Sequence, residues 1–356
     1  MALRKKSIQF WAFWIFFQAA MFVIGYFKQK NDFGLRVLDK LEYSVFISRG
    51  AGLSLAVTSA LLITPMCRNT VMFLRDHTFL PRIFPMDEGI YFHKVCAWTV
   101  LFFSVVHTNG HYVNFFNVER ILSVLGLRAY QIHYTMWGGA TGHVMVMLMF
   151  FMYTAAAIKV RHQSFETFWF IHHLGIIWYL CIFFHGYGCF VHTVEGQCRP
   201  YYSWAYNLFV CTIYFGERIF REIRGRRQTT VANAVLHPGN ALEIQWDKPS
   251  FQYKPGQYVF ICVPEVSGVQ WHPFTITSCP EERYGSVHIR LVGDWTKAVA
   301  RVMGCLDEKR DFRTVELRVD GPYAAPADRV FEYDHAVLVG AGIGVTPFAS
   351  ILKSMY

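Results

Sequence analysis

Residues 93–111 read HKVCAWTVLFFSVVHTNGH. Most of this segment is apolar, and it is long enough for a helix across the ~30 Å core of a bilayer, which takes ~20 residues. It nevertheless contains His93, His107 and His111, and an ionisable side chain inside a membrane is costly unless it has a partner. The segment therefore predicts a membrane helix whose histidines have binding partners.

Five other segments of the chain have a similar length and apolar character. Together with residues 93–112, the expected spans are residues 8–27, 43–66, 138–158, 172–191 and 204–220. The chain has 356 residues, of which 53% are hydrophobic and 17% aromatic, and the apolar ones lie mostly in these segments. This pattern predicts a polytopic α-helical membrane bundle of six spans embedded in a lipid bilayer.

Basic residues gather at one end of the expected spans: Arg4, Lys5, Lys6, Arg68, Arg75, Arg82, Lys159, Arg161, Arg218, Arg221, Arg224, Arg226 and Arg227. The positive-inside rule makes this the cytosolic side, with both termini in the cytosol. The net charge of +9 therefore belongs to span ends, and we expect no nucleic-acid partner. The first apolar segment lacks a small-residue cleavage site and is interpreted as a span.

The composition changes at Gln228, after which short apolar runs alternate with Gly, Pro and charged residues. Residues 231–236, 241–246, 258–263, 274–277, 287–292 and 315–319 are expected to be strands of an antiparallel β-barrel. Residues 336–339 are expected to be a buried strand, followed by a glycine turn at 340–344 and a helix at 346–353. The predicted domains are residues 1–222 (membrane), 228–330 (barrel) and 333–356 (the start of an α/β nucleotide-binding domain).

Two expected spans carry histidines at matching depths. His93 and His107 are separated by roughly 21 Å along one helix, and His172 and His185 by roughly 19 Å along another. Two axial pairs at two depths could hold two b-type haems. Fourteen residues bring His107 to within roughly 40° of His93, but thirteen leave His185 roughly 140° from His172, and starting from His173 does not repair the mismatch. We expect the fifth helix to be distorted or to cross the third at an angle.

Other polar residues in the spans have candidate roles. His111, one turn after His107, is expected to be a polar residue near a haem edge rather than a ligand. Arg49 needs a counter-ion, for which a haem propionate or a carboxylate at the cytosolic edge could serve. Trp169 could aid electron entry or anchor the helix at the interface. His143 and His192 are expected to be structural.

The soluble part contains two motifs that could hold a flavin. The first is HPFTITS at residues 272–278, namely His272, Pro273, Phe274, Thr275, Ile276, Thr277 and Ser278. The second is HIRLVGDWT at 288–296, which starts at His288. Thr275 could hydrogen-bond the flavin edge, Arg290 could pair with the pyrophosphate, and Thr296 could cap a helix whose N-terminus faces phosphate.

A glycine-rich turn, GAGIGVTPF at residues 340–348, follows the expected strand. Such a turn lets backbone amides approach an anionic dinucleotide closely, and its context between a strand and a helix strengthens the interpretation. The candidate contacts are Gly340, Gly342, Gly344, Thr346 and Pro347.

These motifs resemble one known family. The four span histidines, the HPFT and GDWT segments and the GIGVTPF turn are similar to those of the phagocyte-type NADPH oxidases, within the ferric-reductase-like superfamily. NVER at 117–120 and SFETFW at 164–169 are especially similar to fungal members. The resemblance extends over essentially the whole chain.

The resemblance implies that His93 and His172 bind a cytosolic-side haem, and that His107 and His185 bind an outer one. It implies a ferredoxin-reductase-type barrel with FAD at residues 272–278, and NADPH at the glycine turn. Electrons would pass from cytosolic NADPH through FAD and two haems to oxygen, producing superoxide. The partners that it implies are a small membrane protein, cytosolic activators and a Rac-type GTPase.

The sequence departs from the family pattern at two places. Ala324 stands after DGPY at 320–323, where the family usually has Gly. The chain ends at Tyr356, so we expect an incomplete NADPH-binding domain that cannot sustain NADPH turnover. A ferric or cupric reductase of the same superfamily, and a non-enzymatic haem-binding scaffold, are the alternatives. Cys189 and Cys198 could form a disulfide or remain free thiols.

Overall fold

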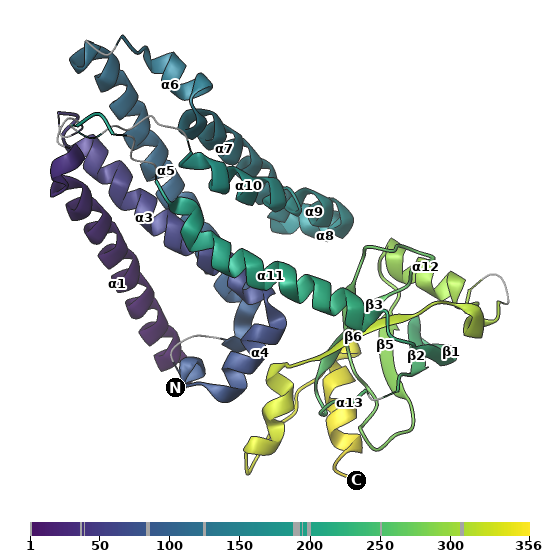
Figure 1. Ribbon diagram of the computed structural model, residues 1–356. Coiled ribbons are helices and arrows are strands. Elements are labelled where there is room, and N and C mark those ends of the chain that lie inside the picture. Colours follow the sequence, from purple (N-terminus) through teal and green to yellow (C-terminus); the bar gives the residue numbers. More distant parts are fainter. Residues whose placement is uncertain are drawn as a thin grey trace. The chain divides into compact units, whose positions relative to one another are not determined.

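The computed structural model describes residues 2–35, 38, 40–82, 86–123, 126–187, 193, 195–197, 201–249, 251–306 and 310–356 (Figure 1). The chain divides into two compact units. The first comprises Met1–Cys67 and Phe79–Tyr214, and the second comprises Arg68–Thr78 and Phe215–Tyr356. Helix α11 (Ser203–Gly225) contributes to both units.

The first unit is helical. Its elements are α1 (Ala2–Lys30), η1 (Phe33–Leu35), α3 (Tyr43–Ile63), η2 (Thr64–Met66), η3 (Leu80–Arg82), η4 (Met86–Glu88), α5 (Gly89–Ile121), α6 (Ala129–Thr135), α7 (Trp137–Ala156), α8 (Ile158–Gln163), α9 (Phe165–His172), α10 (Gly175–His185) and the first part of α11. Among the described residues, five segments are long and apolar enough to cross a membrane: Ile8–Lys30, Tyr43–Met66, Met86–Ile121, Trp137–Ala156 and Phe165–His185.

The expected sixth span, residues 204–220, lies within α11. These residues are helical, as expected, but α11 is not among the five apolar candidates. Asn207, Glu217 and Arg218 lower its hydropathy. The count of six spans is therefore not confirmed.

Helix α3 packs against both α1 and α5, and the three lie side by side in Figure 1. Glycine allows the close approach of α1 and α3: a Cβ on Gly25 would lie 2.9 Å from the Arg49 carbonyl oxygen, and one on Gly50 would lie 2.8 Å from that of Phe22. Small residues serve this purpose in membrane helix pairs. A buried hydrogen bond of 3.0 Å from Gln18 Nε2 to Thr58 Oγ1 joins the same helices.

The fifth span differs from the expected single helix at residues 172–191. It begins at Phe165, and it consists of α9 and α10 with a turn at His173 and Leu174 between them. Helix α7 contacts both parts.

The second unit contains two antiparallel three-stranded sheets. Their orders are β1-β2-β5 and β4-β3-β6. The strands are β1 (Thr230–His237), β2 (Ala241–Asp247), β3 (Tyr258–Cys262), β4 (His272–Thr275), β5 (Gly285–Arg290) and β6 (Arg318–Tyr323). All six expected strands are present with shifted ends, and an isolated bridge between Ile276 and Val287 joins the sheets. A closed barrel is not confirmed.

The remaining elements of this unit are helical: α4 (Arg68–His77), α12 (Asp294–Val302), η6 (Phe312–Thr314), η7 (Pro326–Glu332), η8 (Gly342–Val345) and α13 (Thr346–Lys353). Both sheets and α12 share one apolar core. Alternate side chains of β2 enter this core, namely Leu242, Ile244 and Trp246, as the period of two requires.

The expected buried strand at residues 336–339 is wrong. These residues form no strand, and Val337 and Val339 are 90% and 82% exposed. A parallel strand of a nucleotide-binding fold is buried between neighbours, and no described strand pairs with this segment. The predicted helix at 346–353 is confirmed as α13.

A buried acid joins the second part of α11 to β6. Asp320 accepts hydrogen bonds from Arg221 Nε at 2.9 Å, from Arg224 Nε at 2.8 Å and from the Tyr323 hydroxyl at 2.6 Å. Asp320 and Arg221 are both buried. Burial lowers the pKa of Arg221, but Tyr323 and Asp320 raise it more, so its net pKa lies above the ordinary value.

Candidate cofactor sites

The four span histidines form two facing pairs in the first unit. The ring centroids of His93 on α5 and His172 on α9 are 6.0 Å apart, and those of His107 on α5 and His185 on α10 are 6.1 Å apart. A metal-bound imidazole nitrogen lies about 2 Å from its metal, so two imidazoles on opposite sides of one iron have centroids about 6 Å apart. The spacing of both pairs therefore fits an iron between the rings.

Hydrogen bonds at Nδ1 orient three of these rings. His93 Nδ1 lies 2.9 Å from the Leu62 carbonyl oxygen and His107 Nδ1 lies 2.9 Å from that of Ser48. Because a carbonyl oxygen only accepts, Nδ1 is the protonated nitrogen in both rings, and Nε2 is left with a free lone pair. Metal-binding histidines are commonly held in this way.

His185 is oriented by a threonine instead. The Thr141 hydroxyl donates to the Trp137 carbonyl oxygen and lies 2.9 Å from His185 Nδ1. With its proton committed, this hydroxyl accepts from Nδ1, which again leaves Nε2 free. His172 Nδ1 is buried, and no described residue bonds to it.

Two glycines adjoin the pair formed by His107 and His185. A Cβ at Gly52 would lie 3.4 Å from His107 Cε1, and a Cβ at Gly142 would lie 3.3 Å from His185 Cε1. The second contact would be tighter than most Cβ contacts. Larger side chains here would compete with the rings for space, so the glycines keep room beside both imidazoles.

The break in the fifth span accounts for the phase problem found in the sequence. Helix α9 ends at His172, and α10 begins at Gly175. A continuous helix would turn His185 away from His172, whereas the intervening turn resets the phase and both face α5. The distorted-helix alternative is the one observed. His173 packs instead on Trp169, with centroids 4.1 Å apart, and its Nδ1 lies 2.6 Å from the Trp169 carbonyl oxygen.

His111 and Arg49 lie close to the pair formed by His107 and His185. The His111 ring is 4.4 Å from that of His107, and Arg49 interacts electrostatically with His107, His111 and His185. The Arg49 guanidinium lies over the Tyr201 ring at 3.7 Å. Among the described residues, Arg49 Nε and His111 Nδ1 are buried without a hydrogen-bond partner. Both polar atoms could receive groups of a bound cofactor.

The remaining span residues have local contacts. Trp169 packs on His173, while Phe168 is the residue that lies 5.1 Å from His172. His143 bonds to the Tyr112 hydroxyl and the Gly139 carbonyl oxygen, both at 2.8 Å, which fits a structural role. His192, Cys189 and Cys198 lie outside the described residues.

In the second unit, the start of the HPFT segment contacts a tryptophan. The His272 ring stacks on Trp295 with centroids 3.9 Å apart, and the Phe274 ring lies 6.1 Å from Trp295. Burial lowers the pKa of His272 to about 4, so this imidazole is neutral at pH 7. Pro273 is exposed and Thr275 is half-buried, so both are accessible from outside the core.

The end of the same segment points into the protein. Ile276 is fully buried in the apolar core. Thr277 Oγ1 bonds to Ser286 Oγ and to His288 Nδ1, each at 2.9 Å. Ser278 Oγ accepts from the Tyr253 hydroxyl and from the Ser286 amide, each at 2.8 Å. These three side chains are therefore engaged inside the domain.

The second motif surrounds the N-terminus of α12. Arg290, at the end of β5, is exposed. Thr296 Oγ1 accepts from the Gly293 amide at 3.1 Å and donates to the Gly293 carbonyl oxygen at 2.9 Å. The predicted helix cap is confirmed, and the positive end of α12 follows closely after Arg290.

The glycine turn is exposed. Gly340, Gly342 and Gly344 are all at the surface, and Gly342 has a φ of 55°, which glycine adopts without strain. Thr346 Oγ1 bonds to the Ile343 carbonyl oxygen at 2.9 Å, and Pro347 occupies the first turn of α13. A 2.6 Å bond from Ser350 Oγ to the Ser278 carbonyl oxygen attaches α13 to the connection between β4 and β5.

Sequence reasoning missed the groups that orient the histidines. Leu62 and Ser48 act through backbone carbonyls, which carry no side-chain signal. Gly52 and Gly142 were not singled out because their function depends on which ring they adjoin. Thr141 could have been suspected as a polar residue in an apolar span.

Comparisons with known proteins give consistent matches. Residues 51–183 match the family model for the ferric reductase like transmembrane component, and residues 226–327 match that for the FAD-binding domain. A superoxide-generating NADPH oxidase heavy chain of Dictyostelium discoideum is 37% identical over 331 residues, covering 87% of this chain and 62% of that protein. NADPH oxidase 1 of Mus musculus is 33% identical over 411 residues, covering 98% and 69%.

Among solved structures, a ferredoxin NADP+ reductase from Neisseria gonorrhoeae aligns with 35% of this chain and 49% of its own. The identity is 17% and the TM-score is 0.29. The chain spans 62% of the length of the Dictyostelium discoideum protein and 69% of the length of the Mus musculus protein.

Proposed function

Because the chain belongs to the NADPH oxidase family, we propose that it carries electrons from cytosolic NADPH through FAD and two b-type haems to molecular oxygen, producing superoxide. The observation that carries this proposal is the pair of facing histidine pairs, with ring centroids 6.0 and 6.1 Å apart. His93 and His172 would hold the cytosolic-side haem, and His107 and His185 the outer one.

The residues in the first unit fit two haems. Each pair has a spacing that fits an iron between the rings, and His93, His107 and His185 would bind it through Nε2 because Nδ1 is engaged. When bound, haem exchanges single electrons and FAD converts a hydride into single electrons.

The histidine pairs also restrict where oxygen can react. The two histidines of each pair would hold an iron between them, so that oxygen would accept its electron without binding to the metal. His111 adjoins His107 on the outer side of the pair, and Arg49 supplies a buried positive charge nearby. We propose that Arg49 pairs with a haem propionate and that its charge favours the superoxide anion. Trp169 would be an aromatic anchor through its contact with His173.

In the second unit, exposed and half-buried groups would hold FAD. Thr275 would bond the flavin edge, Arg290 would pair with the pyrophosphate, and the N-terminus of α12 would face phosphate. His272, stacked on Trp295, would supply a neutral imidazole beside the flavin. The amides at Gly340, Gly342 and Gly344, together with Thr346 and Pro347, would receive NADPH.

The chain is an integral membrane protein. We propose that α11 is a sixth span and that both termini lie in the cytosol, as the distribution of basic residues favours. By family resemblance, a small membrane protein, cytosolic activators and a Rac-type GTPase would be its partners. Molecular oxygen and the lipid bilayer would be its other partners.

The function is tested on the full chain in lipid nanodiscs with haem bound. The haems are reduced under argon with half a molar equivalent of dithionite per iron, which supplies one electron per iron, and mixed with aerated buffer or with a ferric chelate under argon. We expect rapid reoxidation by oxygen with superoxide formed, detected as superoxide-dismutase-sensitive reduction of cytochrome c, and slow reoxidation by the chelate.

Variants distinguish oxygen reduction at a specific site from nonspecific oxidation of the haems. His111→Leu and Arg49→Met should slow reoxidation by oxygen at unchanged haem content, whereas the exposed His162→Leu should not. Fast reduction of the chelate and slow reaction with oxygen would indicate a metal reductase instead. Reoxidation that is slow with both acceptors would indicate a haem-binding scaffold.

A further inference from the structure

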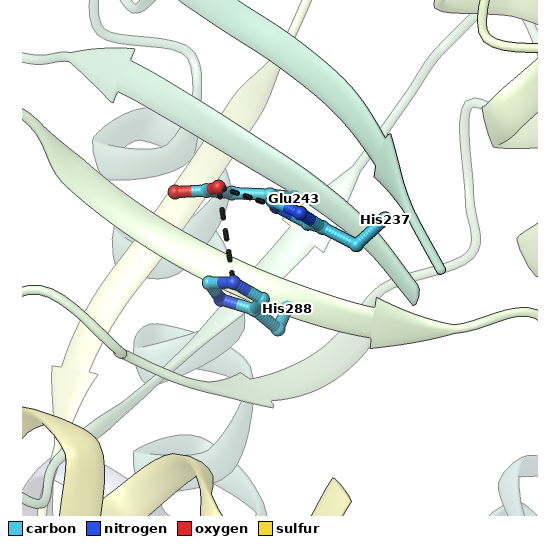
Figure 2. Close-up of side chains that lie close together, drawn as sticks. All are labelled: His237, Glu243 and His288. Carbon is cyan, nitrogen blue, oxygen red and sulfur yellow. Dashed lines mark hydrogen bonds and ion pairs between the residues drawn. The ribbon is translucent and has the colours of Figure 1, made fainter. Parts of the chain in front are cut away.

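Three side chains of types that bind metals meet on the sheet β1-β2-β5 of the second unit, whereas both histidine pairs belong to the first unit. His237 comes from the end of β1, Glu243 from β2 and His288 from β5 (Figure 2). In β2 and β5 the alternate residues, such as Leu242, Ile244 and Ile289, are buried in the core. Strand alternation therefore turns the three polar side chains to the opposite face of the sheet.

The candidate ligand atoms converge on one carboxylate oxygen. His237 Nε2 lies 2.8 Å and His288 Nε2 lies 3.8 Å from Glu243 Oε2. One ligand atom of each residue lies within 4.8 Å of the other two, and the two rings are nearly parallel, 5.5 Å apart at 17°. A Zn²⁺ ion with ligands at about 2.0–2.2 Å needs donor atoms about 3–3.5 Å apart. Small rotations of the three side chains satisfy this requirement.

Further hydrogen bonds orient two of these side chains through atoms other than the candidate ligand atoms. Gln245 Nε2 donates to the other oxygen of Glu243 at 2.8 Å. His288 Nδ1 lies 2.9 Å from Thr277 Oγ1. Both contacts leave the ligand atoms, Oε2 and Nε2, directed at each other. Partners of this kind orient the ligands of metal sites and set the imidazole tautomer.

The charges of the cluster also suit a cation. Burial lowers the pKa of His288, which favours the neutral form of its imidazole. Burial raises the pKa of Glu243, but hydrogen bonds from Gln245 and His237 outweigh it, and the net pKa lies below the ordinary value. The cluster offers two imidazoles and one carboxylate.

We propose that His237, Glu243 and His288 form a binding site for a divalent transition metal, with Zn²⁺ as its occupant. Two imidazoles and one carboxylate are a ligand set that Zn²⁺ accepts, with water in the fourth position. The ion would link β5 to the β1–β2 hairpin, which ends at Asp247, 38 residues before β5 begins at Gly285, and so stabilise this sheet. The site would sit behind Thr277, within the predicted flavin segment.

The experiment uses the full chain with haem bound, so that the span histidines are occupied. After treatment with EDTA, Zn²⁺ is titrated at micromolar free concentration in competition with a chromogenic chelator. We expect one Zn²⁺ per wild-type chain, and loss of that ion in His237→Ala, His288→Ala and Glu243→Gln. The matched control is His335→Ala, which removes an exposed histidine of the same unit.

Two further measurements distinguish loss of the metal site from loss of the fold and identify the ligands. Without Zn²⁺, wild type and Glu243→Gln should have similar melting temperatures, while Zn²⁺ should raise only that of the wild type. X-ray absorption at the zinc edge should detect two imidazoles and one carboxylate. No binding by the wild type, or equal binding by wild type, His237→Ala and His288→Ala, would overturn the proposal and leave an ordinary hydrogen-bonded cluster.

Discussion

The imidazole rings of His107 on α5 and His185 on α10 lie 6.1 Å apart, centroid to centroid. A backbone carbonyl orients the first ring and a threonine hydroxyl the second. The two residues come from different spans and from different hydrogen-bonding environments, yet both have Nε2 free for a metal. This relationship is repeated at the other depth by His93 and His172, except that no described partner bonds to His172 Nδ1.

Replacing Gly142 by Val should remove the outer haem. A Cβ there would lie 3.3 Å from His185 Cε1, so the larger side chain would displace the ring. The haem-to-protein ratio, measured by the pyridine haemochrome method, should fall by about half, as expected when one of two haems is lost. Gly138→Ala is the control, because its Cβ would meet only a carbonyl oxygen at an ordinary 3.6 Å. A full complement of haem in Gly142→Val would contradict this account of the pocket.

Replacing Arg49 by Met should lower the midpoint potential of one haem without releasing it. The guanidinium is a positive charge near His107 and His185, and its removal makes an added electron less favourable. A charge at this range corresponds to a shift on the order of tens of millivolts. A spectroelectrochemical titration measures it, with Arg161→Met as the comparison. Identical titrations for wild type and Arg49→Met would leave Arg49 a structural role through Tyr201.

Acid should destabilise the second unit through His272. Its pKa in the folded chain is about 4, against an ordinary value of 6.5, because the ring is buried against Trp295. Between these two values the unfolded chain binds a proton that the folded chain does not, so stability falls as the pH drops from 6.5 to 4. His272→Phe keeps the aromatic stack and should weaken this dependence in thermal unfolding followed by tryptophan fluorescence. His335→Phe should not, and an equal acid sensitivity of His272→Phe and wild type would refute the assignment.

Removing the buried acid at Asp320 should unfold the second unit more readily. Asp320→Ala leaves Arg221 buried without its main counter-charge, and breaking a buried pair in this way costs about 3–5 kcal/mol. Urea unfolding at pH 7 measures the change. Glu316→Ala, which removes an exposed carboxylate paired with Arg318, should cost less than about 1 kcal/mol. Similar losses in the two variants would show that the network around Asp320 carries little stability.

The strands of the second unit and the helix α13 could be predicted because they depend on local signals. Short apolar runs between Gly, Pro and charged residues located all six strands of the second unit, and the glycine turn at 340–344 preceded the predicted helix α13. The strand at 336–339 could not be judged in this way, since a short apolar run forms a buried strand only beside partner strands. Likewise, polar residues made α11 less apolar than the other spans.

The histidine pairing was only partly accessible from the sequence. Spacing placed four histidines at two depths, and the family resemblance supplied the partners. Periodicity alone predicted that His185 would face away from His172, because it assumes an unbroken helix. The turn at His173 and Leu174, which resets the phase, has no Pro or Gly signal before Gly175. The carbonyl partners of His93 and His107 depend on the packing of α3 against α5.

Haem content in four single variants tests the central claim most directly. His93→Ala and His172→Ala should each retain only the outer haem, and His107→Ala and His185→Ala only the inner one, so every haem-to-protein ratio should be about half that of the wild type. Within each pair the two variants should give the same residual spectrum and midpoint potential. His143→Ala, whose imidazole bonds Tyr112 and Gly139, should keep both haems. Wild-type ratios in all four histidine variants would contradict the ligand assignment and, with it, the proposed route of electrons.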